Sequence, residues 1–268
     1  MSGVAAYDCQ SPPCDRCDRN SPSVAPLTVF CDFDGPIVDV SKRYYTTYKL
    51  ALADTQSAYQ AKGITLPIQQ LEKQQFWQMK QDRVADEEIA LRSGLQGEAI
   101  KFFLARVLEI VNQPLLLHLD KLQPGVHWAL ATLHSHGIRL ILVTLRCQKQ
   151  AEQILRNYGL TRLFSGIYGT YDHQAAYRNN AQVKQQLLAQ ALTEQDFFSL
   201  NPQSVWMIGD TEADLLAAQS VSIPTVALTC GIRSYRYLQQ FQPNHTCYDL
   251  LTATDYLLDK IKQKNNHL

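Results

Sequence analysis

Apolar runs alternating with amphipathic stretches restrict the fold of this chain more than any other feature of its sequence. Strand-sized apolar runs cover residues 27–31, 138–143, 166–170, 204–208 and 224–229. Helix-like spacing of apolar residues covers 126–136, 148–158, 181–192, 214–220 and 249–262. Strands alternating with helices predict right-handed crossovers and a parallel sheet with helices on both faces. We therefore expect an α/β fold with three layers.

Residues 42–119 follow a different pattern, because they show helix-like spacing without strand-sized runs. The helical stretches cover 44–52, 68–79, 86–91 and 97–111. They lie between the first predicted strand and the next helix of the alternating pattern, so we expect an all-helical insertion. The α/β core then consists of residues 27–41 and 120–268, which suits one large domain carrying an insertion.

Residues 1–26 are rich in Ser, Pro, Asp and Cys without hydrophobic periodicity, which predicts a flexible leader. Cys14 and Cys17 have the CxxC spacing of metal and redox sites, and Cys9 lies nearby. Because no second CxxC or HxxxH pair follows in the sequence, an ordinary tail is favoured. The leader also lacks the apolar segment of a signal peptide.

Charge and hydropathy argue against two classes of partner. Twenty-five basic and 25 acidic side chains give a formal net charge of zero, which argues against nucleic-acid binding through bulk charge. No apolar run approaches the roughly 18 residues of a membrane span. We expect a cytoplasmic protein with neither nucleic acid nor membrane as a partner, and its oligomeric state stays open.

Polar side chains stand at the ends of three predicted strands. Asp32 and Asp34 follow the first strand, Thr144 the second, and Asp210 with Asp214 the fourth. In an open parallel sheet, ligands bind beyond the carboxyl ends of the strands. Carboxylates that converge there repel one another and require a cation, and an all-oxygen ligand set suits Mg²⁺.

The spacing of Asp32 and Asp34 adds a chemical expectation, since one carboxylate can attack as a nucleophile while the other transfers a proton. Taken singly, these features also have ordinary explanations. A DxDG sequence fits a calcium loop or a turn, Asp210 a helix cap, and Thr144 the end of a strand. Their joint occurrence at strand ends favours a catalytic site.

Three motifs resemble those of one enzyme family. Residues 29–39 match the pattern hhhhDxDGxxxD, residues 142–144 an apolar strand ending in Ser or Thr, and residues 208–214 the pattern GDxxxD. On these motifs the chain resembles the haloacid dehalogenase-like (HAD) superfamily of phosphohydrolases, in particular the phosphoglycolate phosphatase-like branch with a helical, C1-type cap. The resemblance covers residues 27 to about 232 and implies a Rossmann-like core capped by residues 42–119.

The resemblance also implies roles for individual residues. Asp32 attacks phosphorus to form an aspartyl-phosphate, and Asp34 protonates the leaving alkoxide and later activates water. Thr144 and Lys184 bind phosphoryl oxygens, and Arg146 is a further phosphate or carboxylate contact. Mg²⁺ is held by Asp32, the backbone carbonyl of Asp34 and Asp210, with support from Asp214.

The choice of Lys184 rests on its position. Only Lys149 and Lys184 lie between Thr144 and Asp210. Lys149 comes early in the helix after Thr144 and is expected to point away, whereas Lys184 starts the helix before the last motif, where the family places its lysine. A solvent-exposed helix lysine is the alternative.

The leading hypothesis is a Mg²⁺-dependent phosphatase for a small phosphorylated metabolite, with 2-phosphoglycolate as the first substrate to test. Asp34 disfavours a dehalogenase, which needs no acid for its leaving group. A phosphomutase of the same fold and a non-catalytic binding or assembly factor remain alternatives. Pro36 replaces the Thr that usually follows DxDG, and Leu145 precedes Arg146 where relatives often carry Asn, which leaves the substrate open.

The helical insertion is expected to close over the strand ends and contact the substrate. Arg43, Tyr44 and Tyr48 have helical spacing just past the Asp32 loop and could face the site. A solvated arginine and core tyrosines are at least as well supported. Phe76 with Trp77 and Phe102 with Phe103 are expected in the core of the insertion rather than as a platform for stacking a base.

Overall fold

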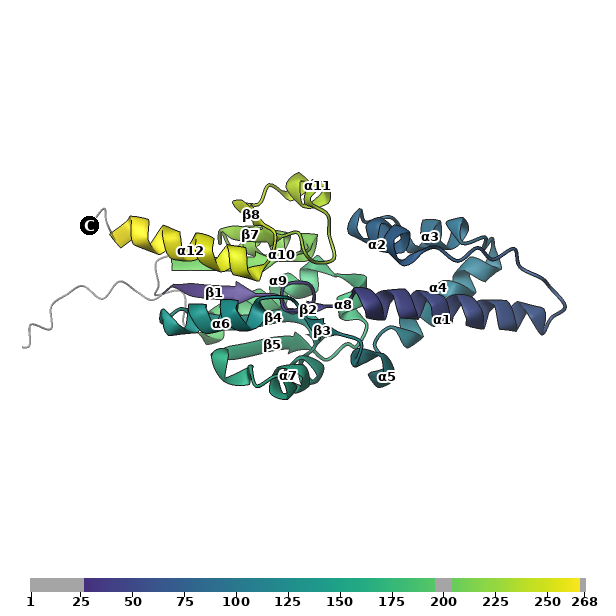
Figure 1. Ribbon diagram of the computed structural model, residues 1–268, viewed down its shortest axis with the longest axis horizontal. Helices are drawn as coiled ribbons and strands as arrows, with labels where there is room; N and C mark the ends of the chain where they lie inside the picture. Colours follow the sequence, from purple (N-terminus) through teal and green to yellow (C-terminus); the bar gives the residue numbers. More distant parts are fainter. Residues whose placement is uncertain (1–26, 196–203, 266–268) are drawn as a thin grey trace, which may run out of the picture.

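The computed structural model describes residues 27–195 and 204–265, and a six-stranded parallel sheet forms its centre (Figure 1). In order across the sheet, the strands are β5 (Gly166–Thr170), β4 (Arg139–Cys147), β1 (Thr28–Cys31), β6 (Val205–Gly209), β7 (Thr225–Leu228) and β8 (His245–Cys247). All neighbouring pairs run parallel. The predicted α/β fold on a parallel sheet is confirmed.

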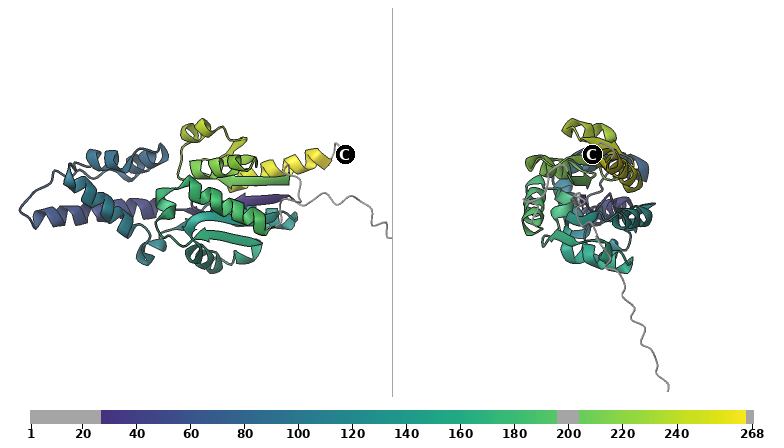
Figure 2. Two further views of the ribbon diagram at one scale, coloured as in Figure 1. Left: turned by 180° about the vertical axis from the view of Figure 1, so that it is seen from behind. Right: turned by 90° about the vertical axis from the view of Figure 1, so that its left-hand side faces the viewer.

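Helices cover both faces of the sheet, as the views in Figure 2 show. The helices α6 (Val126–Ser135), α7 (Gln148–Asn157) and α12 (Leu250–Asn265) pack on one face, and α9 (Ala181–Glu194) and α10 (Glu212–Ser220) on the other. Side chains along β1 alternate between these two faces of the sheet. Val29 and Cys31 belong to one buried cluster, and Phe30 belongs to the other. Burial on both faces explains why this strand is a continuous apolar run.

Five helices within residues 41–117 form a separate group beyond one end of the sheet (Figure 1). They are α1 (Ser41–Gln60), α2 (Lys73–Gln81), α3 (Asp86–Arg92), α4 (Glu98–Ile110) and α5 (Pro114–Leu117). The chain enters and leaves this group through an antiparallel pair of short strands, β2 (Val38–Asp39) and β3 (Lys121–Leu122). Phe76 and Phe103 are buried inside the group, as expected, whereas Trp77 and Phe102 are only partly buried.

Several short elements were not expected from the sequence. The edge strand β8 and four short helices have only three or four residues each, too few to show a period. The helices are η1 (Thr161–Leu163), α8 (Ala175–Arg178), α11 (Tyr235–Leu238) and η4 (Gln239–Phe241). The strand that was expected to end before Thr144 continues to Cys147, with an irregular register after Val143.

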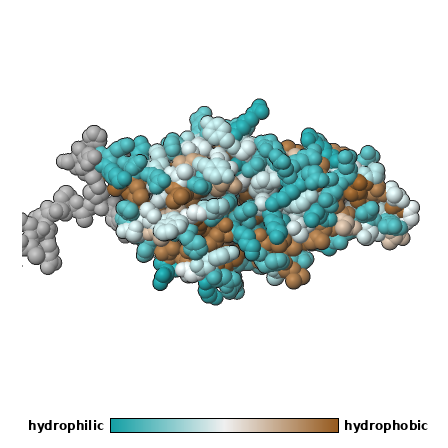
Figure 3. Space-filling model, viewed as in Figure 1, coloured by the Kyte–Doolittle hydropathy of each residue, from teal (hydrophilic) through white to brown (hydrophobic). Residues whose placement is uncertain are grey.

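Two expectations concern the ends and the surface of the chain. The leader at 1–26, with Cys9, Cys14 and Cys17, lies outside the described residues. Among the helices that are described, none has both the length and the apolar character to span a membrane. On the face shown in Figure 3, hydrophilic residues cover much of the surface and apolar ones form scattered patches.

Candidate active site

Three buried carboxylates converge where β1 and β6 end. One ligand oxygen from each of Asp32, Asp210 and Asp214 lies within 4.8 Å of the others. The pairing of the two strands brings them together, since the backbone N–H of Asp32 donates to the carbonyl of Ile208 at 3.0 Å and extends the ladder past β1. The sequence-based expectation that these strand ends meet at one edge therefore describes their actual arrangement.

Lys184 is the cation of this cluster. Its Nζ lies 2.8 Å from Oδ1 of Asp32 and 2.6 Å from Oδ1 of Asp214. The side chain comes from the first turn of α9, which Asn180 caps by accepting from the N–H of Gln182. Burial opposes the charge, but Asp214 and Asp32 outweigh it and raise the pKa of Lys184, which therefore stays protonated. Lys149 is exposed.

Asp214 is held by the start of α10. Its Oδ2 accepts from the backbone N–H and the hydroxyl of Thr211 at 3.1 and 2.8 Å, which forms a capping box. The other oxygen faces Lys184. Asp214 thus fixes the lysine relative to the helix N-terminus.

Asp210 is enclosed by backbone. Its Oδ2 accepts from the N–H of Ile232 at 2.5 Å. A Cβ at Gly35 or at Gly231 would lie only 2.0 Å from this Oδ2, so both loops can approach the carboxylate only as glycine. Its Oδ1 is buried and has no hydrogen-bond partner among the residues that the structure describes.

The charge of the cluster is unbalanced, because three carboxylates face one ammonium group. Burial and the charge of Asp214 raise the pKa of Asp32 to about 7, although Lys184 opposes this shift. Burial, Asp32 and Asp214 also raise the pKa of Asp210 well above its usual range. The excess negative charge and the unpartnered Oδ1 of Asp210 fit a divalent cation bound by oxygen ligands.

Asp34 belongs to a second buried network. Its Oδ1 lies 2.6 Å from Nε of Arg146, and its Oδ2 lies 3.3 Å from Nη2 of Arg43. Both arginines also bind Asp120, at 2.6 Å from Arg146 and 2.9 Å from Arg43. Two arginines and two aspartates form a closed and neutral quartet that joins the core to the start of α1.

Thr144 and Arg146 occupy the irregular end of β4. The hydroxyl oxygen of Thr144 accepts from the backbone N–H of Arg146 at 3.1 Å, and both residues are buried. Within residues 27–195 and 204–265, Nη1 of Arg146 has no hydrogen-bond partner. One donor of this guanidinium therefore stays available for an anion.

The residues just past the Asp32 loop have different roles. Arg43 is buried and faces the site through Asp34. Tyr48 lies in the core of the insertion, where its hydroxyl hydrogen-bonds Ser93 at 2.8 Å. Tyr44 reaches the core of the protein and packs edge to face against Tyr177, with ring centroids 5.2 Å apart.

The insertion also contacts the site through the end of α2 and the turn after it, a contact that the sequence did not predict. Arg83 lies 2.9 Å from Glu212 in the first turn of α10, and Glu212 also pairs with Arg233 at 2.8 Å. The backbone carbonyl of Gln81 accepts from the N–H of Ser234 at 2.9 Å. The loop that supplies the Ile232 N–H to Asp210 is therefore packed against α2.

Asp120 was not predicted from the sequence as a site residue. The only feature of the sequence that could have indicated it is its position where the chain returns from the insertion to the core. Its partners lie 77 and 26 residues away in the sequence. No local pattern identifies such partners.

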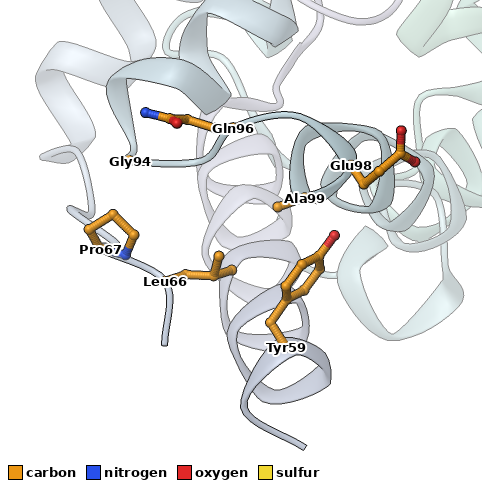
Figure 4. A pocket seen from close by; sticks show the side chains of 7 residues that line it. All are labelled: Tyr59, Leu66, Pro67, Gly94, Gln96, Glu98 and Ala99. Carbon is orange, nitrogen blue, oxygen red and sulfur yellow. The ribbon is translucent and has the colours of Figure 1, made fainter. Parts of the chain in front are cut away.

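A separate hollow of about 230 Å³ lies at the far end of the insertion (Figure 4). Its lining residues come from the end of α1, the following loop, the turn between α3 and α4, and the start of α4: Tyr59, Leu66, Pro67, Gly94, Gln96, Glu98 and Ala99. Glu98 pairs with Lys101 at 2.7 Å. Because Glu98 is exposed and already paired with Lys101, none of the residues that line this hollow is a candidate catalytic group.

The motifs that meet at this site match a known family. A family model described as haloacid dehalogenase-like hydrolase matches residues 29–228, which contain the acidic cluster, Lys184 and the Asp34 network. The chain belongs to the haloacid dehalogenase-like hydrolase family. The resemblance expected from the motifs is confirmed.

Curated relatives are similar over part of the chain. A pyrophosphatase PpaX from Halalkalibacterium halodurans is 27% identical over 55% of this chain and 64% of its own length. A phosphoglycolate phosphatase from Psychrobacter arcticus is 28% identical over 53% of this chain, which spans 58% of that relative. One from Aliivibrio fischeri is 26% identical over 80% of this chain and 88% of its own length. The chain thus spans less than two thirds of the first two relatives.

A solved structure shares the fold. A haloacid dehalogenase-like family protein from Streptococcus pneumoniae superposes with a TM-score of 0.62 at 21% identity. The alignment covers 87% of this chain and 98% of the other. The two chains therefore share a fold.

Proposed function

We propose that this chain is a Mg²⁺-dependent phosphatase that hydrolyses a small phosphate monoester through an aspartyl-phosphate on Asp32. The contact of Lys184 with Asp32 at 2.8 Å carries the proposal, because it sets a cation beside the expected nucleophile. Family membership and relatives named phosphoglycolate phosphatase and pyrophosphatase support the same chemistry.

The first step is attack of an Asp32 oxygen on phosphorus, with in-line departure of the ester oxygen. Asp32 must be ionised for this step, and its pKa near 7 in the absence of metal makes a compensating charge necessary. Lys184 supplies one positive charge. Mg²⁺, when held by Asp32, the Asp34 carbonyl and Asp210 with support from Asp214, supplies further positive charge that stabilises the phosphoryl oxygens.

The second role is proton transfer by Asp34, which protonates the leaving oxygen and then accepts a proton from the attacking water. Arg146 and Arg43 hold its carboxylate between them. A protonated carboxyl is a weaker partner for a guanidinium, so Asp34 loosens these contacts while it carries the proton. Thr144, Lys184 and Arg146 bind the phosphoryl oxygens, and the unpartnered Nη1 of Arg146 supports this role within the described chain.

Residues 42–119 act as the cap in this proposal, and residues 27–41 with 120–268 as the catalytic core. The contact of Arg83 with Glu212, two residues past Asp210, supports a cap that covers the site. A cap excludes water from the intermediate and contacts the part of the substrate that leaves.

The substrate to test first is 2-phosphoglycolate, because two of the relatives above are named phosphoglycolate phosphatase. Phosphate release is measured for 2-phosphoglycolate, inorganic pyrophosphate and sugar phosphates, with Mg²⁺ and with EDTA, using Asp32→Asn as control. Release that needs Mg²⁺ and disappears in the variant supports the phosphatase.

Other outcomes point to the alternatives. Phosphate retained on an isomerised sugar indicates a phosphomutase of the same fold. No release and no transfer from any ester, with Mg²⁺ bound, favours a binding or assembly factor. Cytoplasmic localisation, the absence of a nucleic-acid partner and the flexibility of the leader stay predictions from the sequence.

A further inference from the structure

A small cavity of about 10 Å³ lies between the insertion and the core, beside the acidic cluster. Lys80 and Arg83 line it from the insertion, and Asn179, Thr211 and Arg233 line it from the core. Thr211 follows Asp210 directly, so the cavity adjoins the carboxylates. Its volume has room for about one water-sized group.

The walls of this cavity carry excess positive charge. Lys80 is buried and pairs with Asp86 at 2.8 Å, while Arg83 and Arg233 share the single carboxylate of Glu212. Three cations therefore face two carboxylates. The hydroxyl of Tyr177 donates to Asp86 at 2.8 Å and adds no charge. Such a cavity favours an electron-rich oxygen over an apolar group.

Asn179 brings an unused donor to this cavity. Its Nδ2 is buried and has no hydrogen-bond partner anywhere in residues 27–195 or 204–265. A buried donor without a partner is unfavourable, so an acceptor is missing at this position. Asn179 comes immediately before the cap residue of α9, the helix whose first turn carries Lys184.

Two helices, α8 and α2, end at this cavity. Asn179 has φ 51°, and Arg83 has φ 58°. These are two of the four non-glycine residues with positive φ in the described part of the chain, and both line the same cavity. Asn179 is the left-handed C-cap of α8 and Arg83 follows the C-cap of α2, so these conformations end the two helices at the cavity.

We propose that Asn179 is a specificity-determining residue, which donates from Nδ2 to an acceptor oxygen on the leaving group of the phosphate ester. The inference rests on the proposed phosphatase function and adds the residue that selects among esters. A site with a buried donor discriminates strongly against an analogue that lacks the acceptor, because the donor then stays unpaired.

The test compares kcat/KM for an ester with the acceptor oxygen and for its analogue without it, starting with 2-phosphoglycolate and ethyl phosphate. Asn179→Gly removes the amide and keeps the left-handed backbone available. Asn179→Asp keeps the size but replaces the donor by a charged acceptor. We expect both variants to lose at least about tenfold of the preference for the acceptor-bearing ester, measured as the ratio of kcat/KM for 2-phosphoglycolate to that for ethyl phosphate.

Ser222→Gly is the matched control, because Ser222 also has a left-handed backbone, with φ 57°, in the turn after α10. We expect it to keep the wild-type preference. Equal losses on both esters in Asn179→Gly, or an unchanged preference, would overturn the inference while leaving the phosphatase intact. A wild-type enzyme that hydrolyses no ester would overturn the proposed function itself.

Discussion

Arg146 Nε lies 2.6 Å from Oδ1 of Asp34, although the two residues are 112 positions apart in the sequence. The pair is buried and closed by Asp120 and Arg43. The expected acid–base residue is therefore held by a network that joins β4, the insertion and the loop after β1.

Asp120→Asn tests this network. Removing one carboxylate from a buried, neutral quartet leaves a guanidinium charge without its partner, so we expect the free energy of unfolding to fall by about 3–5 kcal/mol. Asp259 pairs with Lys262 at 3.1 Å with both side chains exposed, so Asp259→Asn is expected to change it by less than about 1 kcal/mol. Chemical denaturation measures both, and equal changes would contradict the assignment.

Lys184→Met tests the cation beside the nucleophile. We expect phosphate turnover to fall by about 10²- to 10³-fold or more, because the variant loses the charge that stabilises both Asp32 and the transferred phosphoryl group. Lys149→Met removes an exposed lysine of α7 and is expected to keep wild-type turnover. Similar losses in the two variants would indicate that the ion pair with Asp32 has no catalytic role.

The metal-free protein is expected to lose stability as the pH rises through about 7, because the pKa of Asp32 is raised to about 7 in the folded state. A raised pKa means that the folded state binds the proton more tightly than the unfolded chain, so the stabilisation is present at low pH and disappears above the folded pKa. Asp210 shifts in the same direction, and Lys184 stays protonated throughout.

The measurement is the melting temperature in EDTA at about pH 6 and about pH 8, for wild type and Asp210→Asn. The variant removes one of three buried carboxylates, so its melting temperature should exceed that of wild type most clearly at the higher pH. Mg²⁺ should stabilise the wild type more at the higher pH, since its ligands must be deprotonated. If the wild-type protein in EDTA becomes more stable than Asp210→Asn as the pH rises, the proposed repulsion among the three buried carboxylates is wrong.

Gly231→Ala tests the enclosure of Asp210. The new Cβ would lie 2.0 Å from Oδ2 of Asp210, so the carboxylate or the loop must move, and we expect Mg²⁺ affinity measured by calorimetry to fall by at least about tenfold. Gly137→Ala is the control, because its Cβ meets nothing within 4 Å and its φ is +69°. The control should lose about 1 kcal/mol of stability and keep its Mg²⁺ affinity.

Local patterns in the sequence were sufficient for the fold class and for the acidic cluster. The alternation of strands and helices determined the parallel sheet, and parallel strands place their carboxyl ends at one edge. Asp32 and Asp210 could therefore be brought together without coordinates, whereas Lys184 was assigned through the resemblance to the family. The helical insertion was equally visible, because residues 42–119 lack strand-sized runs.

Only the tertiary structure decided how the remaining polar groups pair. Asp34 meets Arg146 across 112 positions, and Arg43 meets Asp120 across 77, through side chains whose types occur at many other positions. Periodicity reports which face of an element is buried, but it carries no information about which distant charge will compensate a buried one. Asn179 is a further case, because its Nδ2 has no partner in the described part of the chain, and the cavity that it lines forms only when Lys80 and Arg83 of the insertion meet the core.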